Sequence, residues 1–170
     1  RSDLSKLSGI QITDKANDFF PSEGLTPLAA LLKLVSKLEG NFVVRLLYIH
    51  PDHFNFDVLD VMKNDDRFLH YFDIPFQSGS GDVIKLMNRK GTAASYADMI
   101  SKIRKELPDF VLRTTFMTGF PGEKENNFKE TAAFLSEIRP DWSGCFDYSL
   151  EDDTPAYSFR HRVPSRTAKK

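Results

Sequence analysis

The stretch Val111–Glu123, VLRTTFMTGFPGE, decides the fold of this chain. Its first part is mostly β-branched or apolar, which is typical of a buried strand. Gly119, Pro121 and Gly122 then interrupt that pattern and predict a turn. Residues Asn126–Ile138 follow with apolar side chains at helical spacing. The stretch is therefore a strand, a turn and a helix, with the turn at the carboxyl end of the strand, where α/β folds bind ligands.

The same alternation runs through the rest of the chain. Apolar runs predict strands at Gly9–Thr13, Asn41–Ile49, Tyr71–Ile74 and Gly144–Tyr148. Helical spacing predicts helices at Leu25–Glu39, Phe56–Asn64, Asp82–Asn88 and Thr92–Leu107. The run Asn41–Ile49 is almost continuously apolar, so we expect its strand to be covered on both faces. About five strands with long connections indicate an α/β fold with a parallel sheet, either a partial barrel or doubly wound, and too small for an eight-unit barrel.

Composition excludes several classes of protein. The 170 residues are 41% hydrophobic and 28% charged, and a formal net charge of −1 gives no global basic field for nucleic acid. No apolar run approaches the roughly 20 residues that span a bilayer, and the first residues lack a signal-peptide core. The single cysteine, Cys145, excludes an internal disulfide and fits a reducing, cytoplasmic setting. The chain does not begin with Met, and we expect it to be a piece of a longer protein.

The loops after the strands are the places to look for chemistry, because the carboxyl ends of parallel strands meet at one rim. In TGFPGE, Gly119 and Gly122 permit a close approach of backbone to an adenine or a sugar. The alternative is a tight turn with Glu123 as a first-turn helix charge. In PFQSGSGD, Gln77 and Ser78 offer hydrogen bonds to a ribose or a carboxylate. Alternatively, Ser80 or Asp82 of this loop only caps the next helix, which is the simpler interpretation of Asp82.

Two arginines stand inside apolar strands, Arg45 and Arg113. A buried guanidinium is costly unless it is paired, so each predicts a carboxylate, from the protein or from a ligand. A structural ion pair or an exposed position is the simpler interpretation of each. We expect Cys145 to be a small core residue. Tyr148 ends a strand, where its ring is either core or a platform for a flat base.

Several segments resemble one family, the radical S-adenosylmethionine methylthiotransferases. They are IPFQSGSGDVIKLMNRKGT, YADMISKIRKELPD, LRTTFMTGFPGEKENNF and FLSEIRPDWSGCFDYSLEDDTPA, within about residues 25–157. RLLYIHP, LRTTF and GCFDYS are more similar to the branch that modifies an aspartate of a small-subunit ribosomal protein. The QSG after IPF is more similar to the branch that modifies a tRNA adenosine.

The resemblance implies a partial parallel (β/α) barrel of radical S-adenosylmethionine type. Residues 1–157 would hold strands two to six, without the first strand, and residues 158–170 would be a linker or tail toward a further C-terminal domain. The family holds a [4Fe–4S] cluster on a C-x-x-x-C-x-x-C motif and a second cluster in an N-terminal domain. The resemblance therefore places the cluster cysteines upstream of Arg1, so this chain would contain no metal ligands and no catalytic residues, and would be inactive alone.

The resemblance also assigns residues to S-adenosylmethionine. Thr118, Gly119, Phe120, Pro121, Gly122 and Glu123 match the motif that cradles the adenosine. Gln77 and Ser78 match the loop near the ribose or the methionine end, Tyr148 belongs to the strand near the adenine, and Arg113 points to polar contacts inside the barrel.

The function implied by the resemblance is transfer of a methylthio group to the β-carbon of an aspartate in a small-subunit ribosomal protein. In that family S-adenosylmethionine is reduced to methionine and a 5′-deoxyadenosyl radical, and sulfur comes from the second cluster. Two alternatives stay open from the sequence. One is the tRNA adenosine methylthiotransferase, with tRNA as its partner, and the other is a binding module without a cluster. A membrane partner is not expected.

Overall fold

Four parallel strands form the single sheet in the computed structural model, which describes residues 24–168. Their order is β1 (Val44–Leu46), β2 (Phe68–Asp73), β3 (Val111–Thr118) and β4 (Trp142–Asp147), each beside its neighbour in sequence. The register pairs Leu46 with Phe72, Asp73 with Arg113, and Phe116 with Cys145. This confirms the α/β class and the parallel sheet. The strand predicted at Gly9–Thr13 lies outside the described residues.

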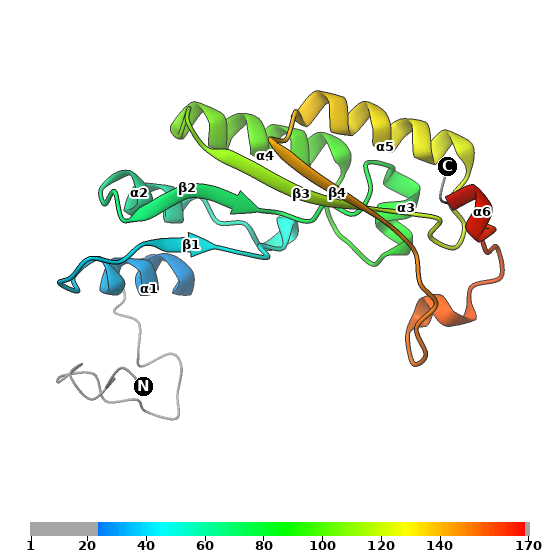
Figure 1. The fold of residues 1–170 in the computed structure, drawn as a ribbon, viewed down its shortest axis with the longest axis horizontal. Helices are drawn as coiled ribbons and strands as arrows, with labels where there is room; N and C mark the ends of the chain where they lie inside the picture. The colour runs from blue at the N-terminus through cyan, green and yellow to red at the C-terminus, as the bar shows by residue number, and fades with distance from the viewer. Residues whose placement is uncertain (1–23, 169–170) are drawn as a thin grey trace.

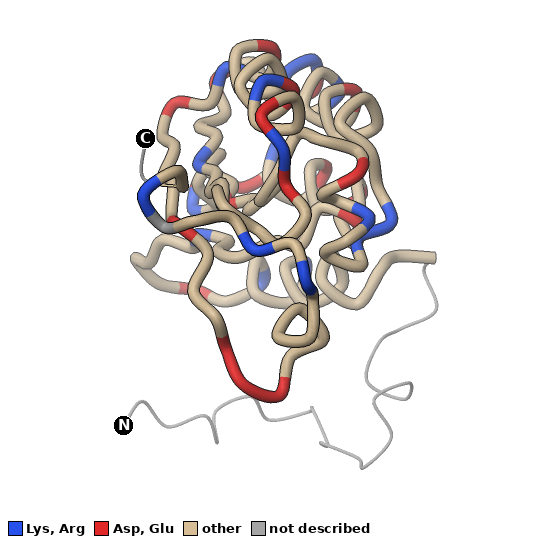
Figure 2. Tube along the Cα trace, turned by 90° about the vertical axis from the view of Figure 1, so that its right-hand side faces the viewer, with Lys and Arg blue, Asp and Glu red and all other residues tan. Residues whose placement is uncertain are grey.

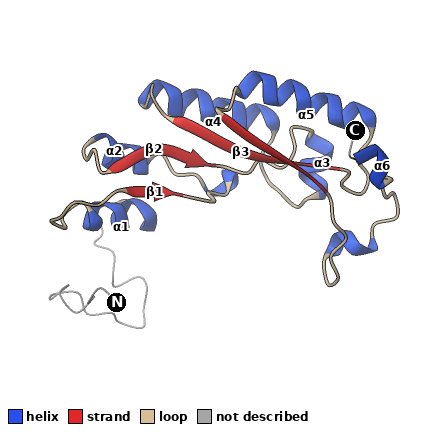
Figure 3. Cartoon of the chain, in the orientation of Figure 1, coloured by secondary structure: helices blue, strands red, loops and turns tan. Residues whose placement is uncertain are grey.

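Helices connect the strands as predicted, and their bounds differ from the predictions by a few residues. The α-helices are α1 (Pro27–Val35), α2 (Asp57–Lys63), α3 (Gly81–Leu86), α4 (Ala93–Glu106), α5 (Glu125–Ile138) and α6 (Ser165–Ala168). Two short 3-10 helices are η3 (Pro51–His53) and η4 (Pro155–Ser158). Figure 1 shows α4 and α5 running side by side along β3 and β4, and Figure 3 shows the same layering of helices against strands.

The helices cover only one face of the sheet. Burial alternates along β3: Leu112, Thr114 and Phe116 are buried, whereas Arg113 between them is exposed. The buried side chains pack with Phe72 and with apolar residues of α2, α4 and α5 in one core. Burying a side chain such as Phe116 contributes roughly 1.5–3 kcal/mol. This layer therefore supplies most of the stability and positions the strand ends.

The other face of the sheet, which we call the open face, is uncovered in the described part of the chain. Because partners in parallel register share a face, Arg45, Tyr71, Arg113 and Trp142 all lie on it. The prediction that Asn41–Ile49 is covered on both faces is wrong. Val43 and Leu47 are 64% and 45% exposed, because the helices pack only on the opposite side of β1.

Strand β4 is exposed along its whole length. Trp142 and Phe146 are 69% and 62% exposed, and Cys145 is exposed as well. The prediction that Cys145 is a core residue is wrong, because β4 is the edge strand of the sheet and its main packing partner is β3. The acidic run Glu151–Asp153 follows in a loop that projects from the body of the molecule (Figure 2). Among the described residues, no helix is long and apolar enough to cross a membrane.

Candidate functional site

The turn after β3 is built on two glycines in the left-handed region. Gly119 has φ +77° and Gly122 has φ +92°, conformations that side chains with a Cβ rarely adopt. Glu123 closes the turn, because its Oε2 accepts a hydrogen bond from the N–H of Gly119 at 2.5 Å. Thr118 ends the strand, and its backbone oxygen accepts from the N–H of Tyr148 at 2.8 Å. The predicted residues Thr118–Glu123 and Tyr148 are therefore brought together at one rim.

Glu123 and Tyr148 each carry an unusual polar atom. Oε1 of Glu123 and the hydroxyl of Tyr148 are buried and have no hydrogen-bond partner within residues 24–168. Burial raises the pKa of the half-buried Glu123, and the hydrogen bond from Gly119 opposes that rise. Buried polar groups in proteins are normally bonded, so these two atoms mark places where a ligand or water completes the site.

Phe120 and Pro121 form the apolar side of the turn. Phe120 is 7% exposed, and its ring meets the rings of Tyr148 at 5.3 Å and Phe159 at 6.2 Å, edge to face in both cases. Pro121 is buried as well. Both residues therefore shape the turn from within the protein, and Phe120 fixes the ring of Tyr148.

The segment after η4 lies against the outer side of the turn. The N–H of Gly122 donates to the backbone oxygen of His161 at 2.7 Å, and the hydroxyl of Thr118 donates to that of Ala168 at 3.0 Å. A Cβ added to Gly119 would come within 2.6 Å of the Ala168 Cβ. This packing requires glycine at position 119, and it places the C-terminal segment beside the helix layer.

The two predicted site residues of the QSG loop (Gln77–Gly79), Gln77 and Ser78, have different hydrogen-bond partners. Gln77 has φ +71° and extends the sheet, because its N–H donates to Thr115 and its carbonyl accepts from Met117, each at 2.8 Å. Ser78 is fully buried, and its hydroxyl lies 3.1 Å from that of Thr131 in α5. Gln77 therefore lies beside β3 near the rim, whereas Ser78 binds the loop to the helix layer.

Neighbouring polar residues complete this anchoring of the loop to α5. Asn127 donates to the hydroxyl of Ser80 at 2.8 Å, and that hydroxyl donates to Glu130 at 2.5 Å. Ser80 is the first residue before α3, and its side chain makes no capping bond to that helix. The prediction that Ser80 or Asp82 caps this helix is wrong, because Ser80 holds the cap position and its hydroxyl bonds to α5 instead.

The two strand arginines have different partners. Arg113 donates from Nη1 to Oδ2 of Asp73 at 2.7 Å, and Asp73 is only 1% exposed. This confirms the structural ion pair as the interpretation of Arg113. Arg45 is exposed, with its guanidinium carbon 5.0 Å from the centre of the Tyr71 ring. This confirms the exposed position as the interpretation of Arg45, since the open face leaves its side chain in solvent.

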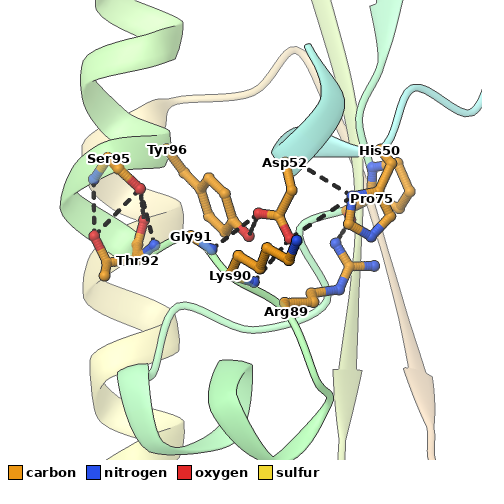
Figure 4. A network of polar contacts seen from close by, with 9 residues as sticks. All are labelled: His50, Asp52, Pro75, Arg89, Lys90, Gly91, Thr92, Ser95 and Tyr96. Carbon is orange, nitrogen blue, oxygen red and sulfur yellow. Dashed lines mark hydrogen bonds and ion pairs between the residues drawn. The ribbon is translucent and has the colours of Figure 1, made fainter.

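A network around Asp52, which sequence reasoning missed, ties the rim loops together (Figure 4). Asp52 accepts hydrogen bonds from the N–H of Lys90 at 2.8 Å, the N–H of Gly91 at 2.9 Å and the hydroxyl of Tyr96 at 2.6 Å. Burial opposes its ionisation, yet these donors hold the pKa of Asp52 below its usual value. The only signal in the sequence was an aspartate directly after a strand end.

Two further residues extend this network toward the sheet. Arg89 donates to the backbone oxygen of Pro75 at 2.9 Å, and burial lowers its pKa. Nδ1 of His50 accepts from the N–H of Asp52 at 3.2 Å, and burial followed by the charge of Arg89 lowers the pKa of His50. These contacts link the loop after β1 to the loop after β2 and to the connection that follows α3.

Potential metal ligands are not grouped together in the described part of the chain. No group of three or more His, Cys, Asp or Glu residues that is suited to a metal ion occurs within residues 24–168. The described part of the chain offers polar and backbone groups for an organic ligand, and it offers no iron–sulfur ligand set.

Comparison with known proteins relates this arrangement to one superfamily. The radical SAM superfamily profile matches residues 20–135. The "Ribosomal protein uS12 methylthiotransferase RimO" of Treponema denticola is 52% identical over 91% of this chain, and its Thermotoga maritima counterpart is 40% identical over 84%. The chain covers 35% and 33% of those relatives, about a third of their length.

A solved structure supports the fold independently. The coproporphyrinogen III oxidase HemN from Escherichia coli, described as a radical SAM enzyme, superposes with a TM-score of 0.66. The match covers 84% of this chain and 34% of that one, at 17% sequence identity. The four parallel strands and their helices therefore correspond to part of a larger barrel.

Proposed function

This chain belongs to the radical SAM superfamily, and we propose that the intact protein is a methylthiotransferase that modifies the β-carbon of an aspartate in a small-subunit ribosomal protein. The observation that carries the proposal is the 52% identity, over 91% of the chain, to a relative named for that activity on uS12. A further relative with the same name is 40% identical. The predicted partial barrel supports the proposal, because it opens at the rim where such folds hold their ligands.

The residues at the rim fit S-adenosylmethionine, which we propose as the cofactor. The test of fit is the pair of buried polar atoms without partners, Oε1 of Glu123 and the hydroxyl of Tyr148, beside a turn whose two glycines adopt left-handed φ values. We propose that the adenosine end is held by Thr118, Gly119, Phe120, Pro121, Gly122, Glu123 and Tyr148. When bound, the cofactor supplies the hydrogen-abstracting chemistry, and the protein supplies binding and orientation.

The remaining proposed contacts lie on the loop after β2 and on the open face. Gln77, beside β3, is proposed to face the ribose or the methionine end, as is Arg113 through the N–H groups that Asp73 leaves free. Ser78 acts by holding the loop, since its hydroxyl is committed to Thr131. Glu123 keeps the N–H of Gly119 directed into the turn, so the backbone shape precedes binding.

The iron–sulfur part of the proposal lies outside the described residues. Residues 24–168 hold no set of three potential metal ligands, so we derive no step through a cluster here. The proposal takes two [4Fe–4S] clusters for the intact enzyme, with cysteine ligands elsewhere in the protein.

The test uses the intact protein with its iron–sulfur clusters reconstituted, S-adenosylmethionine, a reductant and purified uS12. Mass spectrometry of uS12 should show one added methylthio group on one aspartate, and the uS12 variant with asparagine at that position should stay unmodified. A parallel reaction contains total tRNA in place of uS12. Modification of a tRNA adenosine, with uS12 unchanged, would overturn the proposal.

A further inference from the structure

We propose that Arg45 and its neighbours on the open face form a subsite that binds the acidic side chain of the protein substrate. The cluster consists of Arg45, Tyr48, Tyr71, Asp73 and Arg113, and we call it the open-face cluster. The inference rests on the proposed function, because it takes its occupant, an aspartate carboxylate, from that function. It adds which residues of this chain recognise that carboxylate.

The guanidinium groups of Arg45 and Arg113 lie on the same face of the sheet, with β2 between their strands. Arg45 lies over the ring of Tyr71 at 5.0 Å, and Arg113 is bonded to Asp73, two residues further along the same strand. Asp73 raises the pKa of Arg113, and the phenol groups of Tyr71 and Tyr48 raise it to a smaller extent. Tyr48 is 76% exposed and adopts φ +56° just beyond β1. The cluster thus lies where β1 and β2 end.

The charges in the cluster do not balance. Two guanidinium groups face one carboxylate, and that carboxylate, on Asp73, is already bonded to Arg113. Within residues 24–168, no carboxylate lies within ion-pair distance of Arg45, whose one recorded contact is the Tyr71 ring. An arginine presents a planar fork of donors that matches a carboxylate in two parallel hydrogen bonds. Arg45 therefore has its donors available for a carboxylate ligand.

Arg45 lies apart from the residues that are proposed to hold the adenosine. Arg45 is on β1, and β2 lies between it and β3, so it is about 10 Å across the sheet from the strand that carries the glycine turn. The aromatic side chains near Arg45 also give a wall on which a peptide packs. The fit is thus to one aspartate side chain of a partner protein segment that crosses the open face.

Binding by the intact protein tests the subsite without turnover. Fluorescently labelled uS12 is titrated with the intact protein, and its anisotropy gives the dissociation constant. Arg45→Gln should raise that constant at least tenfold for wild-type uS12 and leave it unchanged for uS12 with asparagine at the modified position. Lys129→Gln removes one charge from the outer surface of α5, where Lys129 pairs with Glu125, and should change neither value.

A second variant and a second ligand complete the design. Arg45→Lys retains the charge and loses the fork, and should fall between wild type and Arg45→Gln. S-adenosylmethionine affinity, measured by calorimetry, should be equal in wild type and Arg45→Gln. A selective loss of cofactor affinity would assign the carboxylate to S-adenosylmethionine and overturn the inference.

The remaining outcomes separate the two proposals. If wild-type protein modifies uS12 and Arg45→Gln binds it as tightly, the subsite is wrong and the proposed function stands. If the wild-type protein neither binds nor modifies uS12, both are wrong. Circular dichroism of each variant shows that the fold is retained, as expected for a side chain in solvent.

Discussion

Glu123 holds the turn after β3 with one carboxylate oxygen and leaves the other without a partner. The sequence predicted a charge in the first turn of a helix, yet α5 begins only at Glu125. The carboxylate instead folds back onto Gly119, which is a contact between residues four apart that a turn geometry must create. Because burial raises the pKa of this carboxyl group, its contribution to the free energy of unfolding depends on pH.

The pH dependence of the free energy of unfolding, compared between wild type and a Glu123 variant, tests this effect of burial. Since burial raises the folded pKa above the unfolded value of 4.5, the carboxyl favours folding below that value and loses this contribution as the pH rises through the folded pKa. Glu123→Gln still accepts from Gly119 and does not titrate. The free energy of unfolding of wild type, minus that of Glu123→Gln, should therefore fall as the pH rises from 4 to 8. Urea unfolding at several pH values measures it, and a difference independent of pH would contradict the assignment.

At the scale of elements, Asp52 joins η3 to the connection between α3 and α4 and to α4 itself. It accepts from Lys90, Gly91 and Tyr96, which lie far from it in sequence. Burial and then Asp52 raise the pKa of Tyr96 to about 12, so its hydroxyl remains a donor across the physiological range. The rim loops therefore depend on a single carboxylate for their mutual position.

A double-mutant cycle measures this junction. Tyr96→Phe removes one hydrogen bond to a charged group and should lower the free energy of unfolding by roughly 1.5–3 kcal/mol. Asp52→Asn should cost at least as much, and the double variant should cost less than the sum, because the two residues share one interaction. Additive losses would contradict a direct bond.

The same junction should respond to acid. The folded pKa of Asp52 is below its unfolded value of 3.8, so its contribution is present above that pH and is lost as the pH falls through the folded pKa. The difference in stability between wild type and Asp52→Asn should shrink in the same experiment when it is repeated below pH 3.8.

Gly79, in the loop before α3, and Gly81, the first residue of α3, provide a matched pair of substitution sites that tests how closely this loop packs against α5. A Cβ at Gly79 would come within 2.4 Å of the Phe134 Cβ in α5, whereas a Cβ at Gly81 would meet no atom within 4 Å. Gly79→Ala should therefore destabilise by about 1–3 kcal/mol through overpacking. Gly81→Ala should be neutral or up to about 1 kcal/mol more stable. Chemical denaturation compares the two, and equal effects would contradict the close approach of the loop to α5.

At the scale of the whole molecule, the sheet is buried on its helix side, and the part of the chain that the structure describes leaves the open face uncovered. Apolar and aromatic side chains remain exposed there, including Val43 and Trp142, beside the open-face cluster. The likeness to part of a larger barrel explains the shape, because a barrel encloses its inner face only when it is complete.

The one tryptophan of the chain reports on this exposure. Trp142 is 69% exposed, so in the 170-residue chain its emission should be close to that of a free indole in water and should be quenched efficiently by acrylamide. Steady-state fluorescence with a Stern–Volmer titration measures this. A blue-shifted, protected tryptophan would show that the open face of β4 is covered.

The sequence by itself determined the order of elements and the position of the rim. Helical and strand periodicity record which side chains are buried, so α4, α5 and β3 were predicted to within a few residues. The glycines of TGFPGE likewise marked the turn, because a left-handed φ is a local property of the backbone.

Only the tertiary structure decided which groups meet. It paired Arg113 with Asp73, left Arg45 in solvent, turned Ser78 toward α5 and gathered three donors around Asp52. Ion pairs and hydrogen bonds between distant residues depend on strand register and helix packing, and local periodicity carries no record of either. The position of the rim was thus foreseeable from the chain, whereas the partners of each charge were set by the folding of one layer onto another.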